Sequence, residues 1–341
     1  MFKQSFFLVL LIISLFSGVL FLSSCYPSSP YAPGYNELPG FVGGTIGLAV
    51  NVLDGAPPSV IQDYGLTPFS FVISLENAGE ALVGPGTDNP LILARLAGIP
   101  HKNFGLTQES AAQVLDHVLE PAKRNFDDSI TPGEISYISF DNLVYKPDVF
   151  ESLALTIRAE VCYDYETYAT AQFCMKKDVF DSFQDASICT LKGYKPVGNS
   201  GAPLHITAVW EAPINEKTVQ LNFVIEHLAN GVFFYRSAYT DLWDACVIDD
   251  MNPDIYKIEV FVEPVQDNAY SLDCFRLDNP LPGGGVSGSV RMYRGAPITI
   301  NCFLTRQTST NVRIYQDLIN IKLRYRYAEF LDVPILVQGH P

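Results

Sequence analysis

The side chains best able to do chemistry in this chain are its seven cysteines. One of them, Cys25, follows a long apolar stretch near the N-terminus. The other six are Cys162, Cys174, Cys189, Cys246, Cys274 and Cys302. They include no close CxxC pair of the kind that a zinc site uses, whereas an even number of cysteines in an exported chain is typical of disulfides. We predict up to three disulfides. Cys274–Cys302 is the best single pair, because both cysteines lie in neighbouring strand-like stretches.

An acidic stretch, DDMNPD at 249–254, is the candidate metal site. Its Asp249, Asp250, Asn252 and Asp254 offer the hard oxygen ligands that calcium prefers. A solvated acidic turn has the same composition, so the stretch predicts either a structural calcium loop or an ordinary exposed turn. No other cofactor is predicted.

Motifs of catalysis are absent from the sequence. The five histidines form no HExxH pair, and no GxSxG is present. The glycine run at 283–288 lacks the Lys-Ser/Thr ending of a phosphate-binding loop, so it predicts a glycine-rich hairpin loop. We therefore predict a protein without enzymatic activity.

The N-terminal residues 1–25 predict export. One cation, Lys3, precedes an apolar run at 6–22, and small residues follow it up to Cys25. The ending Leu-Ser-Ser-Cys resembles the lipobox of prokaryotic lipoproteins, which implies that the Cys25 thiol carries a lipid anchor. Two alternatives stay open. The segment could remain as a membrane helix, since about 17 apolar residues are at the lower limit for spanning a bilayer, or the chain could be cleaved and released.

Composition predicts a tethered globular protein. Residues 26–44 hold four prolines and four glycines, which is typical of an extended stalk. The rest of the chain is long enough for two domains, and 48% of all residues are hydrophobic. A net charge of −15 disfavours nucleic acid and anionic lipid as partners, because both would be repelled.

An internal repeat predicts the domain organisation. FVISLENAG at 71–79 is echoed by FVIEHLANG at 223–231, an offset of 231 − 79 = 152. Further on, Tyr163-Asp164-Tyr165 meets Tyr325-Arg326-Tyr327, an offset of 325 − 163 = 162. Landmarks that recur in order predict two tandem homologous domains, at 45–176 and 204–338, joined by a cysteine-bearing linker at 177–203.

Both copies carry strand signals. LALTIRAEVCYDY and LINIKLRYRY alternate apolar and polar residues, the pattern of strands with one buried face. The fold class is therefore predicted as mainly β, with two immunoglobulin-like antiparallel β-sandwiches. The Asn and Gly that end each FVI strand are expected to supply the positive φ angles of a reversal.

One segment, near 107–120, predicts a helical insertion in the first copy. Thr107 is a suitable cap, and Val114, Leu115, Val118 and Leu119 would share one helical face. Such a helix would either cover an open sheet edge or bind a partner.

The ordered cysteines and the stretches GLAVNVLDGAPPSV, FVISLENAG, VCYDYETYATAQFCM and SGAPLHITAV resemble a group of uncharacterised exported archaeal proteins, over nearly all of 45–338. The strand-Asn-Gly pattern is also similar to CARDB-type and other immunoglobulin-like modules of prokaryotic surface proteins. The resemblance implies a membrane-tethered, disulfide-bearing pair of sandwich domains, and it implies no activity.

Together these features predict a membrane-anchored cell-envelope lipoprotein that acts as a structural, adhesion or protein-interaction module, with an envelope protein or polysaccharide as partner. The alternative is a surface binding protein for a small ligand or polysaccharide, with an aromatic cleft between the domains or beneath the helix of residues 107–120. Trp210 and Trp243 could line a carbohydrate or protein surface. Specific function is expected where the copies differ, at 84–130, 176–203 and 241–254.

Overall fold

Strands dominate the computed structural model, which describes residues 38, 40–181, 188–238, 243–249, 251–266, 270–307 and 313–339. Nearly all strand pairs are antiparallel. Within these residues the helical turns are three short 3-10 segments, η1 (His101–Phe104), η2 (Pro282–Gly284) and η3 (Tyr293–Gly295). The predicted mainly-β class is confirmed.

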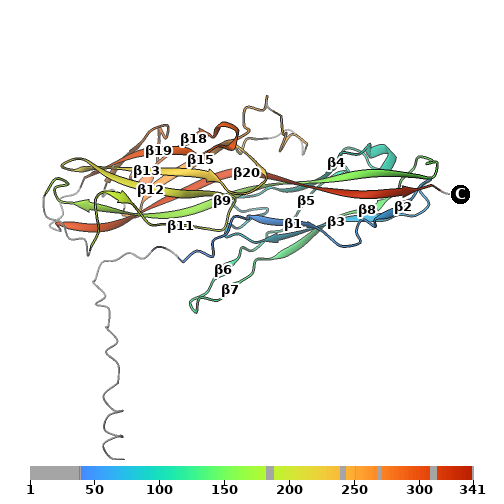
Figure 1. The fold of residues 1–341 in the computed structure, drawn as a ribbon, viewed down its shortest axis with the longest axis horizontal. Coiled ribbons are helices and arrows are strands. Elements are labelled where there is room, and N and C mark those ends of the chain that lie inside the picture. The colour runs from blue at the N-terminus through green and yellow to red at the C-terminus, as the bar shows by residue number, and fades with distance from the viewer. Residues whose placement is uncertain are drawn as a thin grey trace, which may run out of the picture. The chain divides into compact units, whose positions relative to one another are not determined.

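Two long strands form the centre of the fold (Figure 1). β9 (Ser152–Lys176) and β20 (Ile314–Gln338) are 25 residues each and pair antiparallel along their whole length. They belong to a ten-stranded sheet with the main order β17-β18-β15-β20-β9-β4-β5. Its other strands are β2 (Val60–Gln62), β4 (Ile92–Ala97), β5 (Ala112–Val114), β11 (Val197–Asn199), β14 (Val232–Phe234), β15 (Lys257–Pro264), β17 (Asn279–Pro280) and β18 (Val286–Arg291).

Two smaller sheets accompany the central one. The first has the order β1-β3-β8, and the second has the order β10-β12-β13-β19-β16. Their strands are β1 (Leu48–Val52), β3 (Phe69–Asn77), β8 (Ile135–Leu143), β10 (Gly193–Tyr194), β12 (Leu204–Asn215), β13 (Thr218–His227), β16 (Tyr270–Cys274) and β19 (Ile298–Arg306). A separate hairpin joins β6 (Lys123–Arg124) to β7 (Ile130–Thr131).

The strand order of the central sheet is symmetric about the β9–β20 pair. The central sheet runs β18-β15-β20 on one side and β5-β4-β9 on the other, and β1-β3-β8 has its counterpart in β12-β13-β19. In the β9–β20 ladder, Tyr163 lies opposite Tyr327 and Tyr165 lies opposite Tyr325. The boundaries at 45–176 and 204–338 stay a prediction, and the ladder joins both segments in one sheet.

Alternate residues of β9 and β20 face a common hydrophobic core. Tyr163, Tyr165, Tyr325 and Tyr327 are fully buried on this side, and their rings meet edge to face or tilted. Their hydroxyl groups are satisfied internally; for example, Tyr325 Oη and Thr167 Oγ1 are 2.9 Å apart. Because the buried hydroxyl groups have hydrogen-bond partners, these large aromatic side chains fill the core without leaving polar atoms unsatisfied.

The expectation that Gly79 and Gly231 supply the positive φ angles of a reversal is wrong. Neither glycine has a positive φ angle, and neither do the asparagines that precede them. A Cβ atom on Gly79 would lie 2.0 Å from Tyr165 Oη, and one on Gly231 would lie 2.5 Å from Tyr327 Cε1. The repeated glycines are therefore required for the close approach of equivalent tyrosines, and not for a left-handed turn.

The predicted helix near 107–120 is wrong. Residues 108–111 form a turn in which the Thr107 hydroxyl accepts a bond from the Ser110 N–H, and Ala112–Val114 is strand β5. β5 pairs with β4, and the Leu115 N–H donates to the Ile92 carbonyl at 2.9 Å. Strand pairing within the tertiary fold overrides an apolar spacing that also suits a helix.

Candidate functional site

The polar face of β9 and β20, opposite the tyrosines, anchors the segment that carries the predicted acidic loop. Arg95 pairs with Glu160 at 2.5 Å, and its guanidinium donates to the carbonyls of Trp243 and Cys246 at 2.7 and 2.9 Å. Arg326 donates to the Ala245 carbonyl at 3.1 Å. Buried arginines thus hold a loop on the sheet through its backbone, which fixes its position.

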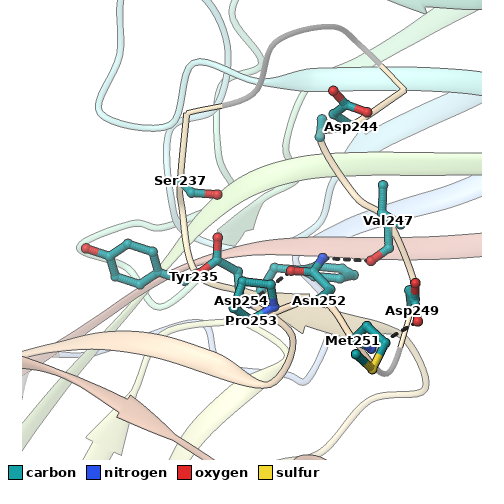
Figure 2. Close-up of a pocket in the computed structure, with 11 residues that line it drawn as sticks. Tyr235, Ser237, Asp244, Val247, Asp249, Met251, Asn252, Pro253 and Asp254 are labelled. Carbon is teal, nitrogen blue, oxygen red and sulfur yellow. Dashed lines mark hydrogen bonds between the residues drawn. The ribbon is translucent and has the colours of Figure 1, made fainter.

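A cavity of about 350 Å³ opens between this anchored segment and the strand end at 234–237. Figure 2 shows Tyr235 and Ser237 on one side and Asp244, Val247 and Asp249 on the other. Its lining mixes acidic, hydroxyl and apolar side chains.

The predicted calcium ligands take part in turn formation. Asp249 Oδ1 accepts from the Met251 N–H, and Asn252 Oδ1 accepts from the Asp254 N–H, both at 2.9 Å. The Asn252 amide donates to the Val247 carbonyl at 2.8 Å (Figure 2). These bonds are those of Asx-turns, which shape a loop without a metal. Asp250 lies outside the described residues.

No cluster of three or more His, Cys, Asp or Glu that could hold a metal occurs among the residues that the structure describes. The hydrogen bonds of Asp249 and Asn252 favour the exposed-turn alternative. The calcium site stays a prediction.

All six later cysteines form disulfides, which are Cys162–Cys246, Cys174–Cys189 and Cys274–Cys302. The predicted Cys274–Cys302 pair is confirmed, and it joins directly opposite residues of β16 and β19. Cys162–Cys246 ties β9 to the anchored loop. Three disulfides fit an oxidising, extracellular environment.

The predicted anchor, residues 1–25 with Cys25, lies outside the described residues. Within the described part of the chain, no helix has the length and apolar character needed to span a bilayer. Anchoring through Cys25 therefore stays a prediction.

The β6–β7 hairpin presents a feature that sequence reasoning missed. Phe126 at its tip is fully exposed. The turn around it is held by hydrogen bonds: Asn125 N–H donates to the Ser129 carbonyl at 2.8 Å, and the Ser129 hydroxyl donates to Asp127 Oδ1 at 2.6 Å. An ordered turn thus holds an aromatic side chain in solvent. The run of turn-forming residues Asn125, Asp127 and Ser129 was the available signal.

This hairpin has no counterpart among the described residues of the second half. It lies in the connection between β5 and β8, whereas the corresponding β18–β19 connection is residues 292–297 with the short η3 turn. Its base is fixed on the repeat motif, since the Ala122 N–H donates to the Gly79 carbonyl at 2.9 Å. Figure 1 shows β6 and β7 extending away from the neighbouring β1 and β3.

The two tryptophans have different surroundings. Trp243 donates from Nε1 to the Gln108 carbonyl at 2.9 Å, and its ring packs beside His101 and Arg95. Trp210 meets Tyr194 on the second small sheet. Neither tryptophan lines the cavity at 234–254.

A scan of protein-family models finds no match to this chain, and a search of curated proteins finds none. Function is therefore inferred from geometry.

Proposed function

We propose that the protein is a non-enzymatic, exported and membrane-anchored cell-envelope protein. Its two immunoglobulin-like halves act as a rigid scaffold that presents a protein-interaction element, the β6–β7 hairpin. The observation that carries this proposal is the full exposure of Phe126 on a hydrogen-bonded tip.

An exposed aromatic side chain on an ordered turn is suited to binding. Burying a Phe side chain contributes roughly 1.5–3 kcal/mol, and a turn that is already ordered loses little entropy when a partner binds. Aromatic side chains are also enriched among the residues that dominate interface energies. Hydrogen bonds from Ser129 lower the pKa of Asp127, so this neighbour of Phe126 is ionised at neutral pH. The partner expected is a protein with an apolar socket and a basic rim.

The scaffold role is supported by the β9–β20 ladder and by the three disulfides. A ladder of 25 residue pairs spans both halves, and cross-links hold a fold that operates outside the reducing cytoplasm. The sequence features at 1–44 add the tether and the stalk.

Site-specific photocrosslinking tests the interaction role. A photoreactive phenylalanine analogue at position 126, irradiated in intact cells, should form one discrete cross-linked species. The same analogue at Phe150, which is also almost fully exposed, is the control. Equal labelling from both positions, or none from position 126, would refute a hairpin interface.

A Cys25→Ser variant tests the tether separately. We expect the wild-type chain in the membrane fraction with a mass shift for the lipid, and the variant without that shift. A wild-type chain that retains residues 1–24 and carries no lipid would exclude lipid anchoring, and it would leave the hairpin result unaffected.

A further inference from the structure

A second cavity, of about 310 Å³, lies on the polar face of the central sheet where β9, β20 and β15 run side by side. The strand register places its side chains in two rows across the three strands. Tyr168, Lys322 and Phe261 form one row, and Thr170, Asn320 and Glu263 form the next. Because members of each row are direct cross-strand neighbours, their positions are fixed by backbone pairing.

The neighbouring row orients Tyr168 through a hydrogen bond to Glu166. Arg324 donates to Glu166 Oε1 at 2.7 Å, and the Tyr168 hydroxyl donates to Glu166 Oε2 at 2.5 Å. The Tyr168 hydroxyl is thus engaged, while 37% of the residue's surface stays exposed. The Tyr168 side chain is held in place beside the cavity.

The two rows leave donors and an acceptor available. The Thr170 hydroxyl donates to Asn320 Oδ1 at 3.0 Å, which leaves the Asn320 NH₂ group for a ligand. Lys322 lies over the Phe261 ring at 4.8 Å. Among the described residues, the Lys322 ammonium and the Glu263 carboxylate have no ion-pair partner and no hydrogen bond. Both groups line the cavity.

This combination selects one chemical class of ligand. The charges of Lys322 and Glu263 balance, and Glu166 in the next row is paired with Arg324, so an anion gains little here. Free donors and an acceptor around an aromatic side chain fit a molecule with many hydroxyl groups and one apolar face. The volume is near the lower end of the roughly 300–1,000 Å³ of small-molecule sites, which suits one or two sugar rings.

We propose that the face formed by Tyr168, Thr170, Asn320, Lys322 and Glu263 binds a neutral saccharide. The sugar ring packs against Tyr168, and its hydroxyl groups bond to Asn320, Lys322 and Glu263. The site is separate from the β6–β7 hairpin, so the two proposals are tested independently.

Titration of the purified, disulfide-intact full chain with cellobiose, maltose and diacetylchitobiose tests this inference, with heat and tyrosine fluorescence as readouts. We expect saturable binding of at least one disaccharide. Asn320→Ala and Tyr168→Ala should each weaken it about tenfold or more, since a lost hydrogen bond or ring contact of about 1.4 kcal/mol corresponds to tenfold.

Tyr293→Ala is the matched control, because Tyr293 is an exposed tyrosine in η3, outside the cavity. Its affinity should equal that of the wild type, and a Tm well above the titration temperature should show that every variant is folded. A galacturonic acid disaccharide is the anionic arm of the experiment. Absence of binding by every neutral probe, equal affinity in Asn320→Ala and Tyr293→Ala, or binding of the anionic probe alone would overturn the proposal.

Discussion

Asp164 and Arg326 lie opposite each other at the centre of the β9–β20 ladder, and their carboxylate and guanidinium groups are 2.9 Å apart. They are also equivalent positions of the internal repeat, because 326 − 164 = 162 and 325 − 163 = 162 for Tyr163 and Tyr325. A residue can face its own repeat equivalent only on a two-fold axis. The predicted repeat therefore places this pair on the local two-fold axis of the antiparallel β9–β20 ladder.

Neutralising the axial carboxylate should destabilise the protein. Asp164→Asn removes the carboxylate that pairs with the buried Arg326 guanidinium, and we expect the free energy of unfolding to fall by about 3 kcal/mol. The control is Asp332→Asn, which breaks the half-exposed Arg158–Asp332 pair and should cost less than about 1 kcal/mol. Urea unfolding of both variants measures the difference, and equal losses would contradict a structural role for the axial pair.

Substituting alanine for either repeated glycine, Gly79 or Gly231, should lower the stability of the protein. Gly79→Ala and Gly231→Ala push a methyl group into Tyr165 and Tyr327, and each should lower stability by about 1–3 kcal/mol. Gly44→Ala is the comparison, because Gly44 has a positive φ angle but nothing within 4 Å of the added atom. Thermal melts that rank Gly44→Ala as the most destabilising of the three would argue against the close-approach explanation.

The disulfides should differ in how much each contributes to the free energy of unfolding. The chain-entropy model gives about 4.6 kcal/mol for Cys162–Cys246 and about 3 kcal/mol for Cys174–Cys189, because the two pairs are separated by 84 and 15 residues. Replacing each pair by two serines and measuring unfolding in urea tests the order. If removing Cys174–Cys189 lowered the free energy of unfolding more than removing Cys162–Cys246, loop-closure entropy would not be the main contribution of these disulfides.

Glu211 should make stability depend on pH. Burial raises the pKa of its carboxyl from the ordinary 4.5 to about 7, although Lys195 at 2.5 Å opposes the shift. The folded state therefore binds the proton more tightly than the unfolded state. The resulting stabilisation is complete below pH 4.5 and is lost as the pH rises through about 7.

Glu211→Gln removes this titration while keeping the shape of the side chain. The Tm of the wild type relative to the variant should be higher at acidic than at alkaline pH. An unchanged Tm difference across this range would show that Glu211 titrates alike in the folded and unfolded states.

Local pattern predicted the class of the fold, since period-two alternation marks strands such as β9 and β20. It also gave Cys274–Cys302, because those cysteines lie in neighbouring strands. Local pattern failed at 107–120, where Leu115 and Leu119 are buried as a helix would require but the backbone pairs with β4 and Val83 instead.

The two proposed sites depend on how residues far apart in the sequence are placed in the fold, so no short stretch of sequence predicts them. Tyr168, Lys322 and Phe261 become neighbours only through the register of three strands. Phe126 is exposed because of where the β6–β7 hairpin leaves the rest of the fold. Only the turn-forming residues around Phe126 could be recognised from the sequence.

The opposite charges on the two-fold axis also bear on which strands can pair. β9 and β20 are similar long strands, and each could align antiparallel with a copy of itself from another molecule. A β9–β9 ladder centred on position 164 would place two aspartates face to face, and a β20–β20 ladder would place two arginines face to face, each at a cost of buried like charge. Only the pairing of unlike strands, β9 with β20, joins Asp164 to Arg326. A single pair of charges thus favours the pairing of β9 with β20 over the pairing of either strand with a copy of itself.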